Sequence, residues 1–124
     1  MKNRRSLIAS VSLSLMFFCG VSEAGEADVL NAVATSTGSS SWRFDVTIKS
    51  NDKGWDYYCD RFEIVGPDGT VLGTRILAHP HVGEQPFTRS VGGVRIAADI
   101  KSVTVRAAMK PDGAGGDTFT VKLP

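Results

Sequence analysis

Cysteine is scarce in this sequence. The 124 residues contain two, Cys19 and Cys59, and the first lies in an N-terminal segment that we expect to be removed. A single remaining thiol excludes an intramolecular disulfide. Three interpretations of Cys59 stay open: a buried small hydrophobe, a thiolate metal ligand, or one half of a disulfide-linked dimer.

Long apolar runs are also missing. The longest, "LIASVSLSLMFFC", has 13 residues, whereas a membrane-spanning helix needs about 20. It follows a basic start and precedes Ser22 and Ala24, small residues at the positions that a signal peptidase recognises. This layout predicts a signal peptide over residues 1–24 and a mature domain over 25–124. We therefore expect a periplasmic or secreted protein with no stable membrane insertion after cleavage.

A lipid anchor on Cys19 is the weaker interpretation of the same segment. The residues before that cysteine are "MFF", and they lack the small side chains expected just before a lipidated cysteine. We expect cleavage by the ordinary peptidase before Gly25.

Neither sign of charge dominates the mature chain. Of 14 basic and 13 acidic residues, cleavage would remove three and one, which leaves 11 and 12. This balance gives no electrostatic reason to expect nucleic acid or an anionic membrane as a partner. About 100 residues suffice for one domain with a real core and leave no room for a second.

Helical periodicity is not visible, and the mature sequence reads as strands separated by turns. In residues 41–50, "SWRFDVTIKS", aromatic and β-branched residues alternate strictly with polar ones, as in a strand with one buried face. Further strands are predicted over 27–37, 55–65, 70–77, 87–96, 101–109 and 118–124, with a turn at 66–69, a short turn in "AADI" and a glycine-rich loop over 110–117.

About seven short strands at this spacing predict an all-β fold, a single immunoglobulin- or fibronectin type III-like β-sandwich. Its predicted core consists of the inward-facing apolar side chains Trp42, Phe44, Val46, Ile48, Phe62, Ile64, Val103, Val105, Phe119 and Val121.

The protein's only two histidines lie one residue apart in "HPHVGEQPFTRS", residues 79–90. In an extended segment His79 and His81 point to the same side, and Pro80 stiffens the link between them. Two converging neutral imidazoles suit copper or zinc, but a stable site needs a third or fourth ligand. The candidates for those further ligands are Cys59, Glu84, Asp56, Asp60 and Met109.

A structural interpretation of the same stretch is equally open. The histidines would then hydrogen-bond locally in a proline-braced connection, and an ion pair between Arg89 and Glu84, with help from Gln85, would hold the loop. The choice between the two depends on whether residues 56–60 lie beside the histidines.

A second cluster, "GWDYYCDRF" over residues 54–62, combines three aromatic residues with charged ones. Trp55, Tyr57 and Tyr58 cannot all face inward on one strand, so we expect at least one to be exposed. Together with Arg89 they form a candidate interaction surface. The alternative is that they only cover the end of the sandwich.

Catalytic motifs are missing. There is no serine in a nucleophile elbow and no carboxylate pair at a meaningful spacing, and "GAGG" over 113–116 precedes a strand rather than opening a helix. Cys59 with either histidine could be drawn as a nucleophile and base, but a lone cysteine and a histidine coincide too often to carry that assignment. We do not expect an enzyme.

The long stretch from "GWDYYCDRFEIV" through "PDGTVLGTR" to "HPHVGEQPFTR" resembles a group of small exported bacterial proteins without an established function. The resemblance runs from about Trp42 to the C-terminus and implies export and a fibronectin type III/immunoglobulin-like fold, but no activity. Members of the group often carry a histidine beside the tyrosine after "GWD". Here Tyr57 and Tyr58 stand there, so a third imidazole is missing unless Cys59 substitutes for it.

These observations predict a periplasmic, non-catalytic β-sandwich that binds another periplasmic protein. The first alternative is a metal-binding protein of copper or zinc handling that uses His79 and His81. The second is an accessory subunit that adds a strand to a partner's sheet edge.

Overall fold

The computed structural model describes residues 27–124. The predicted signal peptide, its cleavage site and Cys19 lie outside the described residues. Within 27–124 there is no helix, and eight strands form two antiparallel sheets. The predicted all-β sandwich is therefore confirmed.

In chain order the strands are β1 (Ala27–Gly38), β2 (Ser41–Ser50), β3 (Tyr58–Val65), β4 (Val71–Ile76), β5 (Phe87–Arg95), β6 (Ser102–Lys110), β7 (Gly113–Ala114) and β8 (Phe119–Lys122).

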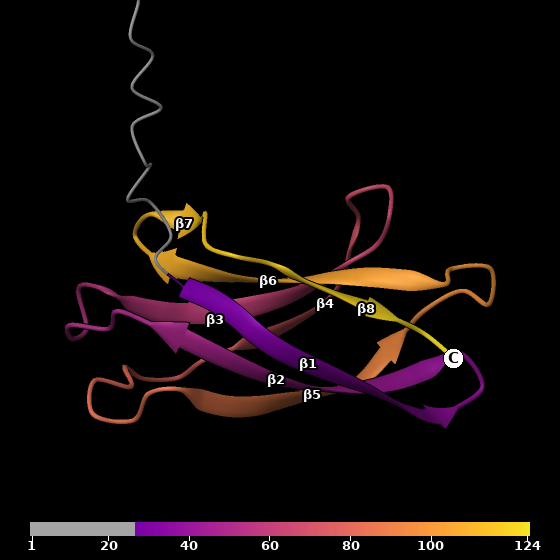
Figure 1. The fold of residues 1–124 in the computed structure, drawn as a ribbon, viewed down its shortest axis with the longest axis horizontal. Coiled ribbons are helices and arrows are strands. Elements are labelled where there is room, and N and C mark those ends of the chain that lie inside the picture. The colour runs from indigo at the N-terminus through magenta and orange to yellow at the C-terminus, as the bar shows by residue number, and fades with distance from the viewer. Residues whose placement is uncertain (1–26) are drawn as a thin grey trace, which may run out of the picture.

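The two sheets are stacked as the layers of a sandwich (Figure 1). One has the strand order β1-β2-β5, and the other has β4-β3-β6-β7 with β8 also paired to β6. The fourth strand of an immunoglobulin constant domain joins the sheet of the first two strands. Here β4 pairs with β3 instead, so the sheets hold three and five strands.

Alternation along the strands builds the core between the layers. Phe44, Val46 and Ile48 of β2 are fully buried, and Phe62 and Ile64 of β3 are fully buried on the other sheet. Burying one such side chain contributes about 1.5–3 kcal/mol to the free energy of folding. The predictions for Val103, Val105 and Val121 are confirmed as well.

Two predicted core residues are only partly buried. Trp42 and Phe119 pack against the core without being enclosed by it. Both stand near the beginning of a strand.

Two local predictions were wrong. The strand predicted over 55–65 begins only at Tyr58, because residues 54–57 form a tight turn in which the Tyr57 amide donates to the Gly54 carbonyl (3.1 Å). The loop predicted over 110–117 contains β7, which pairs with Ala108 and Met109 of β6. Gly113 has a φ of 85°, which suits glycine and lets the chain fold back there.

The sheets are joined along one side by β1 and the segment before β8. The Val29 amide donates to the Asp117 carbonyl (2.8 Å), and the Asp117 amide donates to Asp28 Oδ1 (2.7 Å). Gly116 lies so close to this strand that a Cβ atom would overlap the Ala27 carbonyl. Only glycine fits there, because of space rather than backbone conformation.

The other side of the sandwich is joined by β4 and β5. Gly73 packs directly on the Val94 side chain, and Arg75 Nη1 donates to the Ser90 carbonyl (3.0 Å). The connecting loops gather at the two ends of the sandwich. Residues 51–57 and 77–86 form the loop end, on the left of Figure 1. Residues 38–40, 66–70 and 96–101 form the opposite end.

Candidate functional site

The two predicted clusters lie side by side at the loop end. The His81 amide donates to Asp52 Oδ2 (2.8 Å), and the Leu77 amide donates to the Asp60 carbonyl (2.9 Å). Residues 59–60 therefore do lie beside the histidine segment, which was the open question. The contact runs through the backbone and through Asp52, which did not figure among the predicted site residues.

Asp52 is the centre of this end. Its carboxylate is buried and also accepts hydrogen bonds on Oδ1 from the Ser50 hydroxyl (2.7 Å) and the Cys59 amide (2.9 Å). A buried carboxylate is stable only when it is well hydrogen-bonded. Three donors from three separate segments meet that need, so Asp52 ties the end of β2, the start of β3 and the histidine loop together.

Gln85 adds a second link between the histidine loop and β2. Its Oε1 accepts from the Ser50 amide (2.8 Å), and its Nε2 donates to the Ser50 hydroxyl (3.2 Å) and the His81 carbonyl (2.9 Å). The prediction that Gln85 holds the loop is confirmed. The following Gln85–Pro86 peptide bond is cis.

His81 is buried between Phe87 and Arg89. Its ring stacks on Phe87 with centroids 4.1 Å apart and 9° between the planes, and Arg89 Nη2 lies 3.1 Å from His81 Nε2. A guanidinium can only donate, so Nε2 accepts and the neutral ring carries its proton on Nδ1. That Nδ1 is buried and finds no hydrogen-bond partner among residues 27–124. Burial lowers the pKa of His81, and the charges of Arg89 and His79 lower it further.

His79 lies against His81 but is exposed. The two ring centroids are 4.6 Å apart, and His79 Nδ1 lies 3.0 Å from the Pro80 carbonyl. If Nδ1 donates to that carbonyl, the lone pair of His79 is on Nε2, whereas the Nε2 lone pair of His81 is occupied by Arg89. A metal that used both rings would have to displace Arg89.

The other predicted ligands do not complete a metal site. Across residues 27–124, no three His, Cys, Asp or Glu side chains are grouped so that they could hold a metal ion. Glu84 instead lies 3.4 Å from Arg89, which confirms the predicted ion pair, and Asp56 lies in the 54–57 turn. Metal binding by the histidines stays a prediction.

Cys59 is buried inside the core and its thiol is protonated. Its Sγ lies 3.6 Å from the Arg61 carbonyl. Burial raises the pKa of the thiol to about 12, and the nearby Asp52 carboxylate contributes. Of the three interpretations, the structure agrees with the buried hydrophobe. Before Cys59 could bind a metal as a thiolate, or form a disulfide with a second copy of the chain, β3 would have to open.

The predicted aromatic residues are spread around the 54–57 turn. Trp55 stands at its tip with 63% of its surface exposed, which confirms that at least one of the three is exposed. Its ring meets Tyr58 edge to face at 5.8 Å, and Lys110 Nζ lies 5.9 Å from the Tyr58 ring centroid. Tyr57 instead packs against the core, with Lys53 Nζ 5.4 Å from its ring centroid.

We call Trp55 and Tyr58, whose rings are in contact, the aromatic surface. Val82 is exposed to 60% on the neighbouring histidine loop, and that loop is held to residues 51–57 by Asp52. Arg89, predicted to join this surface, is committed to His81, Glu84 and the Phe87 ring, where its Cζ lies 5.8 Å from the centroid. It supports the loop and does not project freely.

Comparison with known proteins gives one relative of limited coverage. The chain is 33% identical over 96 residues to a protein of Halomicrobium mukohataei named "Putative lipoprotein". The match covers 77% of this chain and 47% of the relative, so the chain spans about half the length of the curated relative it matches. No family model and no solved structure matches the chain. Within residues 27–124 no helix is long and apolar enough to cross a membrane.

Proposed function

We propose that this protein is an exported, non-catalytic β-sandwich module that binds a partner protein in the cell envelope through its aromatic surface. The observation that carries the proposal is Trp55, 63% exposed at the tip of a turn whose base is fixed by the buried Asp52 carboxylate. A large rigid ring on an ordered base loses little entropy on binding, and tryptophan is enriched among residues that dominate interface energies.

Export is supported by two independent features. The N-terminal 24 residues have the three-part layout of a signal peptide, and the Halomicrobium mukohataei relative is named "Putative lipoprotein". The proposal also includes membership in the group of small exported bacterial proteins with the "HPHVGEQPFTR" signature. Periplasmic or secreted location follows if residues 1–24 are removed by signal peptidase.

A non-catalytic role is supported by the state of the polar groups at the loop end. The Cys59 thiol is buried with a raised pKa, the His81 Nε2 lone pair faces Arg89, and the Asp52 carboxylate is hydrogen-bonded to three donors. These groups hold the loops in place.

The proposal is tested by capture and then by direct binding. Full-length protein expressed in its host with a photo-crosslinker at Asp56, the exposed neighbour of Trp55 in the turn, should trap a specific envelope protein, and Trp55→Ala should abolish the product. The purified pair should then bind at least tenfold more weakly with Trp55→Ala, because losing a central aromatic anchor costs about 2 kcal/mol or more. The matched control is Val33→Ala, an exposed valine of β1. Binding that responds equally to both variants would contradict the proposal.

Copper or zinc binding is the second candidate, favoured by the 4.6 Å separation of the two histidine rings. Calorimetric titration with Cu(I), Cu(II) and Zn(II) should then release heat that both His79→Ala and His81→Ala remove. Because Arg89 occupies His81 Nε2, Arg89→Gln should tighten metal binding. No heat, or heat unchanged in the histidine variants, would eliminate this candidate.

A further inference from the structure

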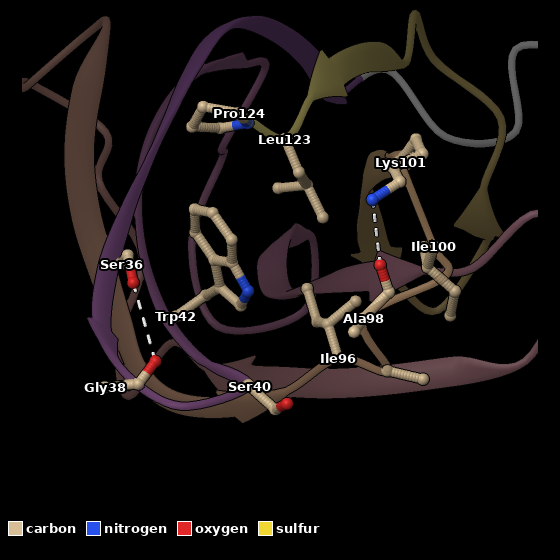
Figure 2. Close-up of a pocket in the computed structure, with 11 residues that line it drawn as sticks. Ser36, Gly38, Ser40, Trp42, Ile96, Ala98, Ile100, Lys101, Leu123 and Pro124 are labelled. Atoms are coloured by element: carbon tan, nitrogen blue, oxygen red, sulfur yellow. Dashed lines mark hydrogen bonds between the residues drawn. The ribbon is translucent and has the colours of Figure 1, made fainter.

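Two adjoining hollows lie at the end of the sandwich opposite the loop end. Their volumes are about 200 and 400 Å³, and Ala97 and Ile100 line both of them. Figure 2 shows the smaller hollow, in which the Trp42 indole stands between Ser36, Gly38 and Ser40 on one side and Ile96 and Leu123 on the other. The larger hollow lies over the 66–70 turn and Leu72 of β4.

The floor of both hollows consists of apolar side chains that the core covers only in part. Trp42, Leu72 and Ile100 pack against the buried cluster yet remain partly exposed. Leu72 belongs to β4, the edge strand of its sheet, and lines the larger hollow. Covering such apolar surface contributes about 25 cal/mol for each Å² removed from water. A partner that covered these side chains would therefore gain free energy of binding from the apolar surface it removes from water.

Charge distinguishes the two hollows. Asp68 and Asp99 line the larger one, and its remaining lining residues are uncharged. A hydrogen bond from the Thr70 amide to Asp68 Oδ1 (3.0 Å) lowers the pKa of that carboxyl, so it stays ionised. The smaller hollow has Lys101 at its rim, where Nζ donates to the Ala98 carbonyl (3.0 Å). The larger hollow therefore carries two acidic side chains, whereas the charged side chain that lines the smaller hollow is a lysine beside the Trp42 ring.

We infer that the two hollows bind an extended peptide segment of a partner protein, which places an apolar side chain over Trp42 and a lysine or arginine against Asp68 and Asp99. Residues i and i+2 of an extended chain lie about 7 Å apart on the same face. Adjoining hollows therefore suit alternate side chains of one segment, as in other recognition of extended peptides.

The test uses the full chain with Trp55→Phe, which leaves Trp42 as the single tryptophan. The probes are pentapeptides acetyl-Ala-X-Thr-Lys-Ala-amide, with X an apolar residue, and the same peptides with glutamate in place of lysine. Trp42 fluorescence and amide chemical shifts of Leu72, Ala97 and Ile100 should change saturably with a lysine probe. The glutamate probes should bind about tenfold more weakly or worse, a difference of about 1.4 kcal/mol.

Asp99→Lys should weaken the lysine probe by a similar factor. Asp112→Lys is the matched control: it makes the same charge change at an exposed position between β6 and β7, and it should leave affinity within about twofold. Three results with the probes would overturn the inference: no change at Trp42 up to millimolar probe, equal binding of both probe charges, or shifts confined to the loop end. Shifts that depend on protein concentration without peptide would overturn it in favour of a second copy of the chain.

Discussion

The two ends of this sandwich cover the hydrophobic core in different ways. At the loop end, Asp52, Gln85 and Ser50 close the core with hydrogen bonds to backbone and side-chain donors. At the opposite end, Trp42, Leu72 and Ile100 are left half covered beneath two hollows. A buried polar network has strict geometry and tolerates no missing member, whereas a partly exposed apolar floor tolerates change. The loop end should therefore be the fragile one.

The largest expected effect comes from removing the centre of the network. Asp52→Ala leaves the Ser50 hydroxyl and the Cys59 and His81 amides without their acceptor. Unsatisfied buried donors cost about 1–3 kcal/mol each, and water entry recovers part of this, so the free energy of unfolding should fall by about 3 kcal/mol. Urea denaturation measures it. Asp112→Ala, at an exposed loop position, should change stability by less than about 0.5 kcal/mol.

Gln85→Ala should have the next largest effect. It removes one link to the Ser50 amide and one to the His81 carbonyl, and we expect a loss of about 2 kcal/mol. Hydrogen exchange should show faster opening of residues 79–86 than of β2. If Gln85→Ala and Asp52→Ala were simply additive, the two residues would not belong to one network, because members of a network are coupled.

Acidification should lower the free energy of unfolding by a smaller amount, through His81 at the loop end. The pKa of folded His81 is lowered, chiefly by burial, so below the ordinary histidine value of about 6.5 the unfolded chain binds a proton that the folded chain does not. The free energy of unfolding should therefore decrease as the pH falls from about 7 through 6.5 and towards the lower folded pKa. Protonated His81 would also face the Arg89 guanidinium.

The pH effect is measured by urea unfolding between about pH 7.5 and 5. His81→Gln should flatten the dependence in that range, while His79→Gln, at the exposed neighbour, should retain most of it. A slope that is unchanged by His81→Gln would place the titrating group elsewhere.

The smallest effect is expected at the opposite end. Leu72→Ala should cost about 1 kcal/mol, below the 2–5 kcal/mol typical of fully buried leucine, because the side chain is already partly exposed. Ile64→Ala, fully buried on the neighbouring strand, is the reference. Equal losses from the two variants would show that the hollows close in solution and would remove the contrast between the ends.

Most strands of the structure could be predicted from the local alternation of apolar and polar residues. Residues 41–50 form β2 over the predicted range, because one strictly alternating face is buried along nearly its whole length. The predictions failed where backbone geometry depends on a few residues: the 54–57 turn shortens β3, and the fold-back at Gly113 adds β7. Both depend on hydrogen bonds that no periodicity reveals.

The candidate site likewise has features that the local sequence predicts and features that depend on contacts between distant segments. "HPHVGEQPFTRS" and "GWDYYCDRF" lie together at the loop end. Two predictions about them are confirmed: the Arg89–Glu84 ion pair, and the exposure of at least one of the three aromatic residues. Asp52 was missed because in "NDKG" an aspartate looks like an ordinary turn residue. Its importance comes from donors 2, 7 and 29 residues away in the sequence, and only the packed loops bring those donors to one carboxylate.

By itself the sequence determined an all-β chain, the faces of its strands that are buried, and a core large enough for one domain, because burial of alternating apolar side chains acts locally along each strand. Only the tertiary structure decided that His81 is neutral and held by Arg89, that Cys59 is enclosed, and that one end of the sandwich is sealed while the other is hollow. Those features depend on distances between segments remote in sequence, and hydrogen bonding and desolvation at such contacts are set by the packed arrangement of the loops.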